Sequence, residues 1–165
     1  MIKNFFAVMA LAVVFVSCKK ESNDCPYPES PKVAPTSEVM SLQSYVSAND
    51  PTAVQHPSGF FYKITNAGTG SVTPGLCSTV TVKYTGTLTN GSKFDENLTG
   101  VSFSLSQLII GWQKGIPLVK SGGSITLYIP PSLGYGSQDV KNASGAVVIP
   151  ANSNLVFTIQ LVNVQ

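Results

Sequence analysis

From Ser58 onward, apolar side chains recur at every second position, and this alternation constrains the fold more than any other feature of the chain. Residues with a repeat of two lie on one face of a β-strand, and the polar residues between them lie on the other. Antiparallel sheets with one covered face have this pattern. The Asn90-Gly91 pair is typical of a two-residue hairpin turn. We therefore predict an antiparallel sheet with strands at 60–65, 79–85, 101–105, 125–129 and 155–161.

Two short segments have helical patterning instead. Residues 109–119 lie between the third and fourth predicted strands and are long enough for two helical turns. Upstream, Leu42 and Val46 share one face of a helix predicted over 38–48, with Ser37 as its N-cap. We expect that apolar face to dock on this domain or on a partner. One sheet with short helices places the chain in the α+β class.

The N-terminus has the pattern of an export signal. Lys3 precedes an apolar run at 5–16, which at twelve residues is too short to cross about 30 Å of hydrocarbon comfortably. The Phe-Val-Ser-Cys motif at 15–18 resembles a bacterial lipobox, which predicts cleavage before Cys18 and acylation of that cysteine. Because Lys19 rather than Asp follows, we expect a lipid-anchored protein of the cell envelope, in the outer membrane. The alternative is an ordinary signal peptide or a short anchor, with Cys18 incidental.

Composition divides the chain into a signal peptide at 1–17, a flexible proline-rich tether at 18–36, a short helical extension at 37–57 and a β domain at 58–165. Once Cys18 is lipidated, two thiols remain, Cys25 in the tether and Cys77 in a loop. Export places them in an oxidising compartment, so a disulfide between them is allowed. Two unpaired thiols are an equally valid interpretation.

The charged and metal-binding residues exclude several classes of function. The chain has ten Lys, no Arg and eight acidic residues, so it lacks the basic surface of nucleic-acid-binding proteins. One histidine and three cysteines are too few for the usual zinc sites, and no glycine-rich phosphate loop follows a strand. We therefore expect neither a metal nor a cofactor. The β domain holds just three carboxylates, Asp95, Glu96 and Asp139, which disfavours acid–base catalysis.

Six short motifs in the β domain carry a resemblance to a known family. They are VKYTG at 82–86, GSKFD at 91–95, IIGW at 109–112, LGYG at 133–136, VIPAN at 148–152 and LVF at 155–157. In this order they resemble the FKBP-type peptidyl-prolyl cis-trans isomerases, the macrolide-binding immunophilins, from about Gly59 to Gln165. The resemblance implies a twisted antiparallel sheet of five to six strands wrapped around one short α-helix, which agrees with the alternation.

The same resemblance implies a shallow apolar pocket for a proline ring. It places Trp112 at the floor and Asp95 at the edge, near the Tyr84 hydroxyl. It makes the Tyr135 hydroxyl and the Ile109 N–H donors to a substrate or macrolide carbonyl. Tyr135 suits that role, because the glycines on either side leave its ring accessible. The remaining pocket residues are the walls Phe94 and Phe157, the rim residue Ile149, and Phe103 beside them.

Three features depart from the family pattern. Val101 stands where many members have another pocket aromatic, the loop at 137–147 is longer than in the minimal domain, and Pro117 lies within the short helix. The first two border the implied pocket, so they bear on substrate preference and on macrolide affinity.

These observations predict a prolyl isomerase that assists the folding of exported or envelope proteins, by desolvating and twisting the imide bond before proline. Its partners would be proline-containing polypeptides, a macrolide inhibitor and, through Cys18, the membrane, with the protein itself a monomer. A non-catalytic peptide-binding or chaperone module on the same fold is the alternative. A dimer formed through the helix at 38–48 is a third interpretation.

Overall fold

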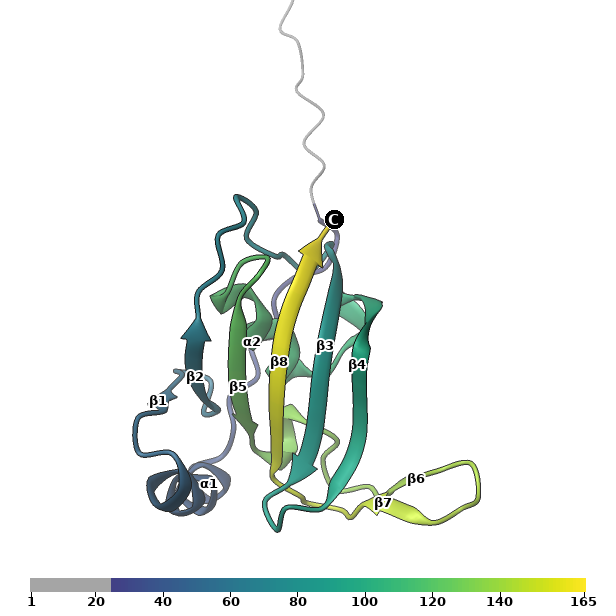
Figure 1. The fold of residues 1–165 in the computed structure, drawn as a ribbon. Helices are drawn as coiled ribbons and strands as arrows, with labels where there is room; N and C mark the ends of the chain where they lie inside the picture. Colours follow the sequence, from purple (N-terminus) through teal and green to yellow (C-terminus); the bar gives the residue numbers. More distant parts are fainter. Residues whose placement is uncertain (1–24) are drawn as a thin grey trace, which may run out of the picture.

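The structure is a computed structural model that describes residues 25–165, so the predicted signal peptide and Cys18 lie outside the described residues. Six antiparallel strands form one twisted sheet in the order β1-β2-β5-β8-β3-β4 (Figure 1). The predicted α+β class, with a sheet of five to six strands, is therefore confirmed. The strands are β1 (Val54–Gln55), β2 (Phe61–Asn66), β3 (Thr79–Leu88), β4 (Lys93–Ser104), β5 (Ser124–Ile129) and β8 (Leu155–Val164).

Strand β4 is longer than the sequence predicts, because it begins at Lys93 directly after the Asn-Gly hairpin turn. Val82 pairs with Val101, but Tyr84 pairs with Asn97, so β4 carries extra residues that form a bulge. The bulge interrupts the alternation of apolar and polar residues. The sequence pattern therefore predicts only the part of β4 that follows the bulge, from Val101 onward.

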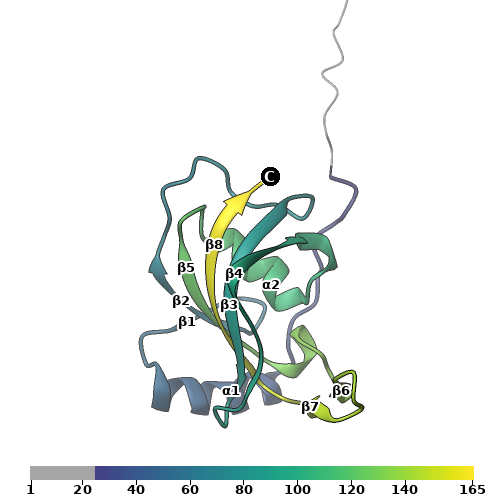
Figure 2. The ribbon, with the colours of Figure 1, turned by 45° about the vertical axis from the view of Figure 1, so that its right-hand side comes forward.

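Helix α2 (Ile110–Gly115) covers one face of the sheet and continues into the 3-10 turn η2 (Ile116–Leu118) (Figure 2). A Cβ atom added at Gly111 would lie 2.6 Å from Ile129 Cδ1 of β5, so this glycine allows the helix to pack close to the sheet. The predicted helix at 109–119 is thus α2 plus η2. Pro117 falls in η2, where its missing N–H breaks no α-helical hydrogen bond.

Helix α1 (Thr36–Asn49) packs on the other face of the sheet. Its buried residues Leu42 and Val46 contact Phe61 of β2 and Tyr128 of β5. Tyr128 points away from α2 because neighbouring side chains of a strand alternate between faces. The apolar stripe predicted for 38–48 therefore docks on its own domain.

The start of α1 differs from the prediction. Pro35 occupies the N-cap position, with φ −58° and ψ 147°, and no side chain caps the helix. Ser37 lies inside the first turn, so its assignment as N-cap is wrong. Proline suits the boundary because its ring presets φ and it has no N–H to satisfy.

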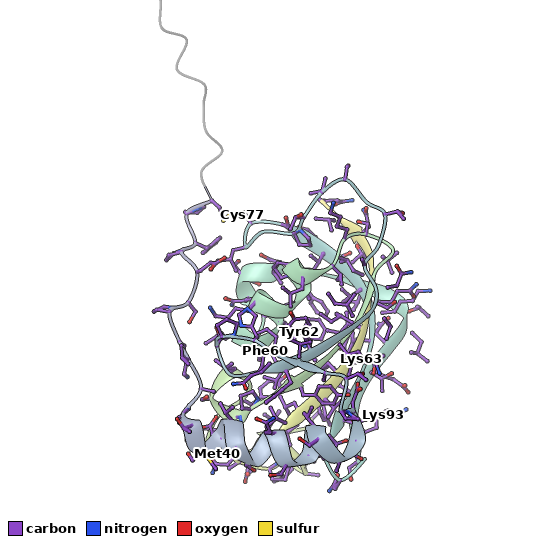
Figure 3. The ribbon with its side chains drawn as sticks, turned by 90° about the vertical axis from the view of Figure 1, so that its left-hand side faces the viewer. Met40, Phe60, Tyr62, Lys63, Cys77 and Lys93 are labelled. Atoms are coloured by element: carbon purple, nitrogen blue, oxygen red, sulfur yellow. A yellow bond between two sulfur atoms is a disulfide. The ribbon has the colours of Figure 1, made fainter. Side chains whose placement is uncertain are left out.

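The segment before α1 is held against the domain at both ends. A disulfide joins Cys25 to Cys77, with 5.5 Å between their Cα atoms, so the two thiols left open by the sequence are paired. At the other end, Ala34 is buried and its N–H donates to the Ser58 carbonyl at 2.9 Å. Figure 3 shows this segment running alongside the domain from the end that carries Cys77 down to α1.

The long loop predicted at 137–147 forms a two-stranded hairpin together with the residues that follow it, with strands β6 (Val140–Lys141) and β7 (Val147–Ile149). The hairpin projects from the end of the domain opposite the C-terminus (Figure 1). Between Cys25 and Gln165, the structure contains no helix long and apolar enough to cross a membrane.

Candidate functional site

A cavity of about 210 Å³ opens between strands β3, β4 and β8 and the start of α2. Seven of the nine pocket residues expected from the sequence line it, together with Leu108, which no motif singled out. Leu108 reaches the cavity because it links the 3-10 turn η1 (Leu105–Gln107) to α2. The lining residues are Tyr84, Asp95, Phe103, Leu108, Ile109, Trp112, Tyr135 and Phe157.

Trp112 forms the base of this cavity and is 4% exposed. The Tyr84 and Phe157 rings meet its indole edge-on, with centroids 5.2 and 5.1 Å away and interplanar angles of 85° and 87°. Edge-to-face packing is a favourable arrangement of aromatic quadrupoles, so the three rings hold each other in place. The indole Nε1 has no hydrogen-bond partner among the described residues.

Two predicted pocket residues are not among those that line this cavity. Phe94 packs edge-on against Phe157, with centroids 5.5 Å apart, and Ile149 is buried in the core. Phe94 therefore supports the wall from outside. Gly86, which the sequence did not mark as a site residue, makes this packing possible. A Cβ atom there would lie 2.6 Å from Phe94 Cε2 and 2.8 Å from Phe157 Cε1.

Asp95 is the single carboxylate that lines the cavity, and it accepts a hydrogen bond from a tyrosine. The Tyr84 hydroxyl donates to Asp95 Oδ2 at 2.6 Å. Burial first, and then the hydrogen bond to Asp95, raise the pKa of Tyr84 above its ordinary value of 10. Tyr84 is therefore a neutral donor at physiological pH, and it orients the carboxylate at the cavity edge.

Tyr135 stands at the mouth of the cavity and is 42% exposed. It follows the 3-10 turn η3 (Pro131–Leu133), and the Gly136 N–H closes the turn onto the Pro131 carbonyl at 2.9 Å. Burial, and secondly the charge of Asp95, raise the pKa of Tyr135. Its hydroxyl thus stays protonated at neutral pH and can donate a hydrogen bond to a bound group.

The chemistry available here is desolvation and hydrogen bonding. The walls are aromatic and aliphatic, and the hydroxyls of Tyr84 and Tyr135 border them. His56 is not among the lining residues, and it stacks on Phe60 with ring centroids 4.3 Å apart. Across residues 25–165, no group of three or more His, Cys, Asp or Glu side chains is placed to hold a metal ion.

Known proteins resemble this chain over much of its sequence. A probable FKBP-type peptidyl-prolyl cis-trans isomerase of Haemophilus influenzae is 44% identical over 110 residues, which cover 65% of this chain and 43% of that protein. The outer membrane protein MIP of Legionella longbeachae is 39% identical over 127 residues, 74% of this chain and 52% of that protein. The chain thus spans about half the length of the curated relatives it matches.

Solved structures show the same fold. The crystal structure of FkpA from Escherichia coli superposes with a TM-score of 0.65 and 34% sequence identity, over 78% of this chain and 58% of that one. The family model of FKBP-type peptidyl-prolyl cis-trans isomerases matches residues 70–162, more than half of the chain and every residue that lines the cavity. The chain belongs to the family of FKBP-type peptidyl-prolyl cis-trans isomerases.

Proposed function

We propose that the protein catalyses cis-trans isomerisation of the peptide bond before proline in polypeptide chains, and so assists the folding of exported proteins. The observation that carries this proposal is the cavity itself. It is small, floored by Trp112, walled by aromatic rings, and bordered by tyrosine hydroxyls and one carboxylate. A site of this kind accepts an apolar ring and offers hydrogen bonds to the carbonyl beside it.

The physical problem in this reaction is amide resonance, which sets a rotation barrier of about 18–20 kcal/mol. The planar imide is more polar than the twisted one, so transfer from water into an apolar cavity favours the twisted form. The Tyr135 hydroxyl and the Ile109 N–H would then hold the rotating carbonyl in the transition state. Asp95 would act through its field and by fixing Tyr84. The rotation itself requires no nucleophile, metal or cofactor.

The test is the rate of cis-trans exchange of a proline-containing tetrapeptide, measured by NMR with and without the protein. We expect faster exchange with the wild type, a reduced rate with Tyr135→Phe, and suppression by a macrolide that competes for the same cavity. A protein that leaves the exchange rate unchanged would refute isomerase activity. If Trp112→Ala lost isomerase activity but still suppressed aggregation of an unfolded client, the protein would have a chaperone activity that does not depend on isomerisation.

We further propose that the protein is a lipid-anchored, monomeric component of the cell envelope, with a signal peptide at 1–17 and an acyl group on Cys18. The lipobox-like motif supports this location, and so does the likeness to an outer membrane protein. Because Cys25 is bonded to Cys77, six residues at 19–24 would link the anchor to the domain, a reach of at most about 25 Å.

Metabolic labelling tests the anchor. Cells expressing the protein are grown with labelled palmitate, and we expect the label on the wild type and not on a Cys18→Ala variant. An unlabelled wild type would contradict the proposal.

A further inference from the structure

We propose that Glu38, on the helix α1 that precedes the residues matched by the family model, is a positioning residue for Tyr135. This inference rests on the proposed isomerase function. Glu38 lies outside the part of the chain that the family model matches, residues 70–162. This role would make the N-terminal helical extension part of the functional site.

The contact joins two segments that are far apart in the sequence. Glu38 Oε2 accepts the backbone N–H of Ser132 at 2.9 Å, across 94 residues of sequence. Glu38 is half-buried between α1 and η3. Hydrogen bonds to a carboxylate are about twice as strong as neutral ones, and partial burial protects this one from solvent screening.

Ser132 is the residue of the turn that most needs an external partner. It follows two prolines, which have no N–H, and the N–H groups in the first turn of a helix have no partner within that helix. Leu133 and Gly134 instead donate within the turn, to Pro130 and Pro131 at 3.1 and 3.0 Å. Glu38 therefore satisfies the one free donor at the start of the segment that ends in Tyr135.

The turn is held at its other end by the backbone. The Gly136 carbonyl accepts the N–H of Asn152 at 2.8 Å, directly after Tyr135. Asn152 adopts φ 58°, which few non-glycine residues do, and this bond accompanies that unusual conformation. Tyr135 thus lies between two hydrogen-bonded positions of the chain. Ser132 before it donates to Glu38 of α1, and Gly136 after it accepts from Asn152.

Helix α1 is rigid enough to serve as a support. Leu42 and Val46 are buried against the sheet, and at the far end of the helix the Asp50 carboxylate accepts three hydrogen bonds. Two of these come from Lys63 Nζ at 3.0 Å and the Tyr128 hydroxyl at 2.9 Å. The buried Leu42 and Val46 therefore hold α1, and with it Glu38, at a fixed place on strands β2 and β5 of the sheet.

Glu38 also has a purely structural role available, because an acidic residue in the first turn stabilises a helix through the dipole. The two roles predict different kinetics. If Glu38 positions a hydroxyl that acts mainly in the transition state, its loss lowers kcat and leaves KM unchanged. If it only stabilises α1, its loss lowers the melting temperature and leaves both constants unchanged.

The test compares three single variants of the protein in the tetrapeptide assay. We expect Glu38→Ala to lower kcat about tenfold, since a small displacement of a catalytic group can cost up to about 10²-fold. Glu38→Gln should retain most of the activity, because its amide oxygen can still accept the Ser132 N–H. Asp50→Asn is the matched control: it weakens the far end of α1, whereas the buried Leu42 and Val46 still dock the helix on the sheet, so kcat should be unchanged.

The double variant Glu38→Ala/Tyr135→Phe tests whether Glu38 acts through Tyr135. If Glu38 acts through the Tyr135 hydroxyl, Glu38→Ala adds little to the loss already caused by Tyr135→Phe. Hydrogen exchange at the Ser132 amide should also accelerate in Glu38→Ala and not in Asp50→Asn. Fully additive losses, or an equal kcat loss in Asp50→Asn, would overturn the proposal.

Failure of the isomerase function is distinguishable from failure of this inference. If the wild type does not catalyse exchange, the geometry of the Tyr135 turn can still be followed by hydrogen exchange at the Gly136 amide, which donates to the Pro131 carbonyl. Faster exchange of this amide in Glu38→Ala, but not in Glu38→Gln or Asp50→Asn, would then support the positioning role. Equal exchange rates at Gly136 in all three variants would contradict it.

Discussion

The Tyr84 hydroxyl donates to Asp95 Oδ2 at 2.6 Å and ties β3 to β4 at the edge of the cavity. Both partners line the cavity, so the contact fixes the direction of its single carboxylate. Because the pKa of Tyr84 is raised, the hydroxyl keeps its proton through the neutral and mildly alkaline range. Asp95 is thereby held as an oriented charge, which is a different role from that of a general base.

Substitution of Asp95 separates those two roles. We expect Asp95→Asn to lower kcat/KM about fivefold, which corresponds to about 1 kcal/mol, the magnitude of one exposed hydrogen bond. The loss should be only partial, because the amide oxygen can still accept from Tyr84. The wild-type pH profile should be flat between about pH 6 and 9, because neither cavity tyrosine titrates there. A bell-shaped profile, or complete inactivation of Asp95→Asn, would identify a general base instead.

A methyl group at Gly86 should damage the cavity wall. Gly86→Ala places its Cβ against Phe94 and Phe157, and overpacking of this kind costs about 1–3 kcal/mol. We expect a lower melting temperature together with a loss of isomerase activity, because Phe157 lines the cavity. Gly75→Ala is the control, since no atom lies within 4 Å of its added Cβ. Equal activity in both alanine variants would show that the packing around Gly86 does not shape the site.

Much of the fold could be predicted from local patterns, because alternation and turn residues report directly on which face of a strand is covered. The aromatic cavity could be predicted from ordered motifs, since Tyr84, Trp112 and Phe157 each lie within one of them. Contacts that depend on long-range geometry could not. The attachment of Glu38 to Ser132 and the pairing of Cys25 with Cys77 join distant segments and leave no local periodicity.

Reduction of the disulfide should destabilise the domain without inactivating it. Cys25 and Cys77 are 52 residues apart, and the chain-entropy account gives about 4 kcal/mol for a loop of this size. Neither cysteine lines the cavity, so isomerase activity at 25 °C should persist in a Cys25→Ser/Cys77→Ser variant. Thermal unfolding followed by circular dichroism measures the first effect. An unchanged melting temperature would show that the cross-link does not restrict the unfolded chain.

Asp50 should make the protein less stable in acid. Burial of its carboxylate acts to raise the pKa, but hydrogen bonds from Thr52, Lys63 and Tyr128 outweigh it and lower the pKa from 3.8 to about 2. The unfolded chain therefore binds this proton more readily than the folded one. The contribution of Asp50 to stability is complete above about pH 4 and is lost as the pH falls towards 2.

Denaturant unfolding at several pH values measures this dependence. Asp50→Asn should be less stable than the wild type at neutral pH, and the difference should shrink between about pH 4 and 2. A difference that stays constant over this range would contradict the lowered pKa.

The measurement that tests the account most directly is the initial rate of cis-to-trans conversion of a proline tetrapeptide at substoichiometric protein. We predict a rate that rises in proportion to protein concentration for the wild type and is lost in Trp112→Ala, which removes the cavity floor. Trp112→Phe is the control for unfolding. It keeps an apolar ring in the core, so it should remain folded and retain partial activity. A wild type that gives the uncatalysed rate, or a folded Trp112→Ala variant as fast as the wild type, would contradict the account.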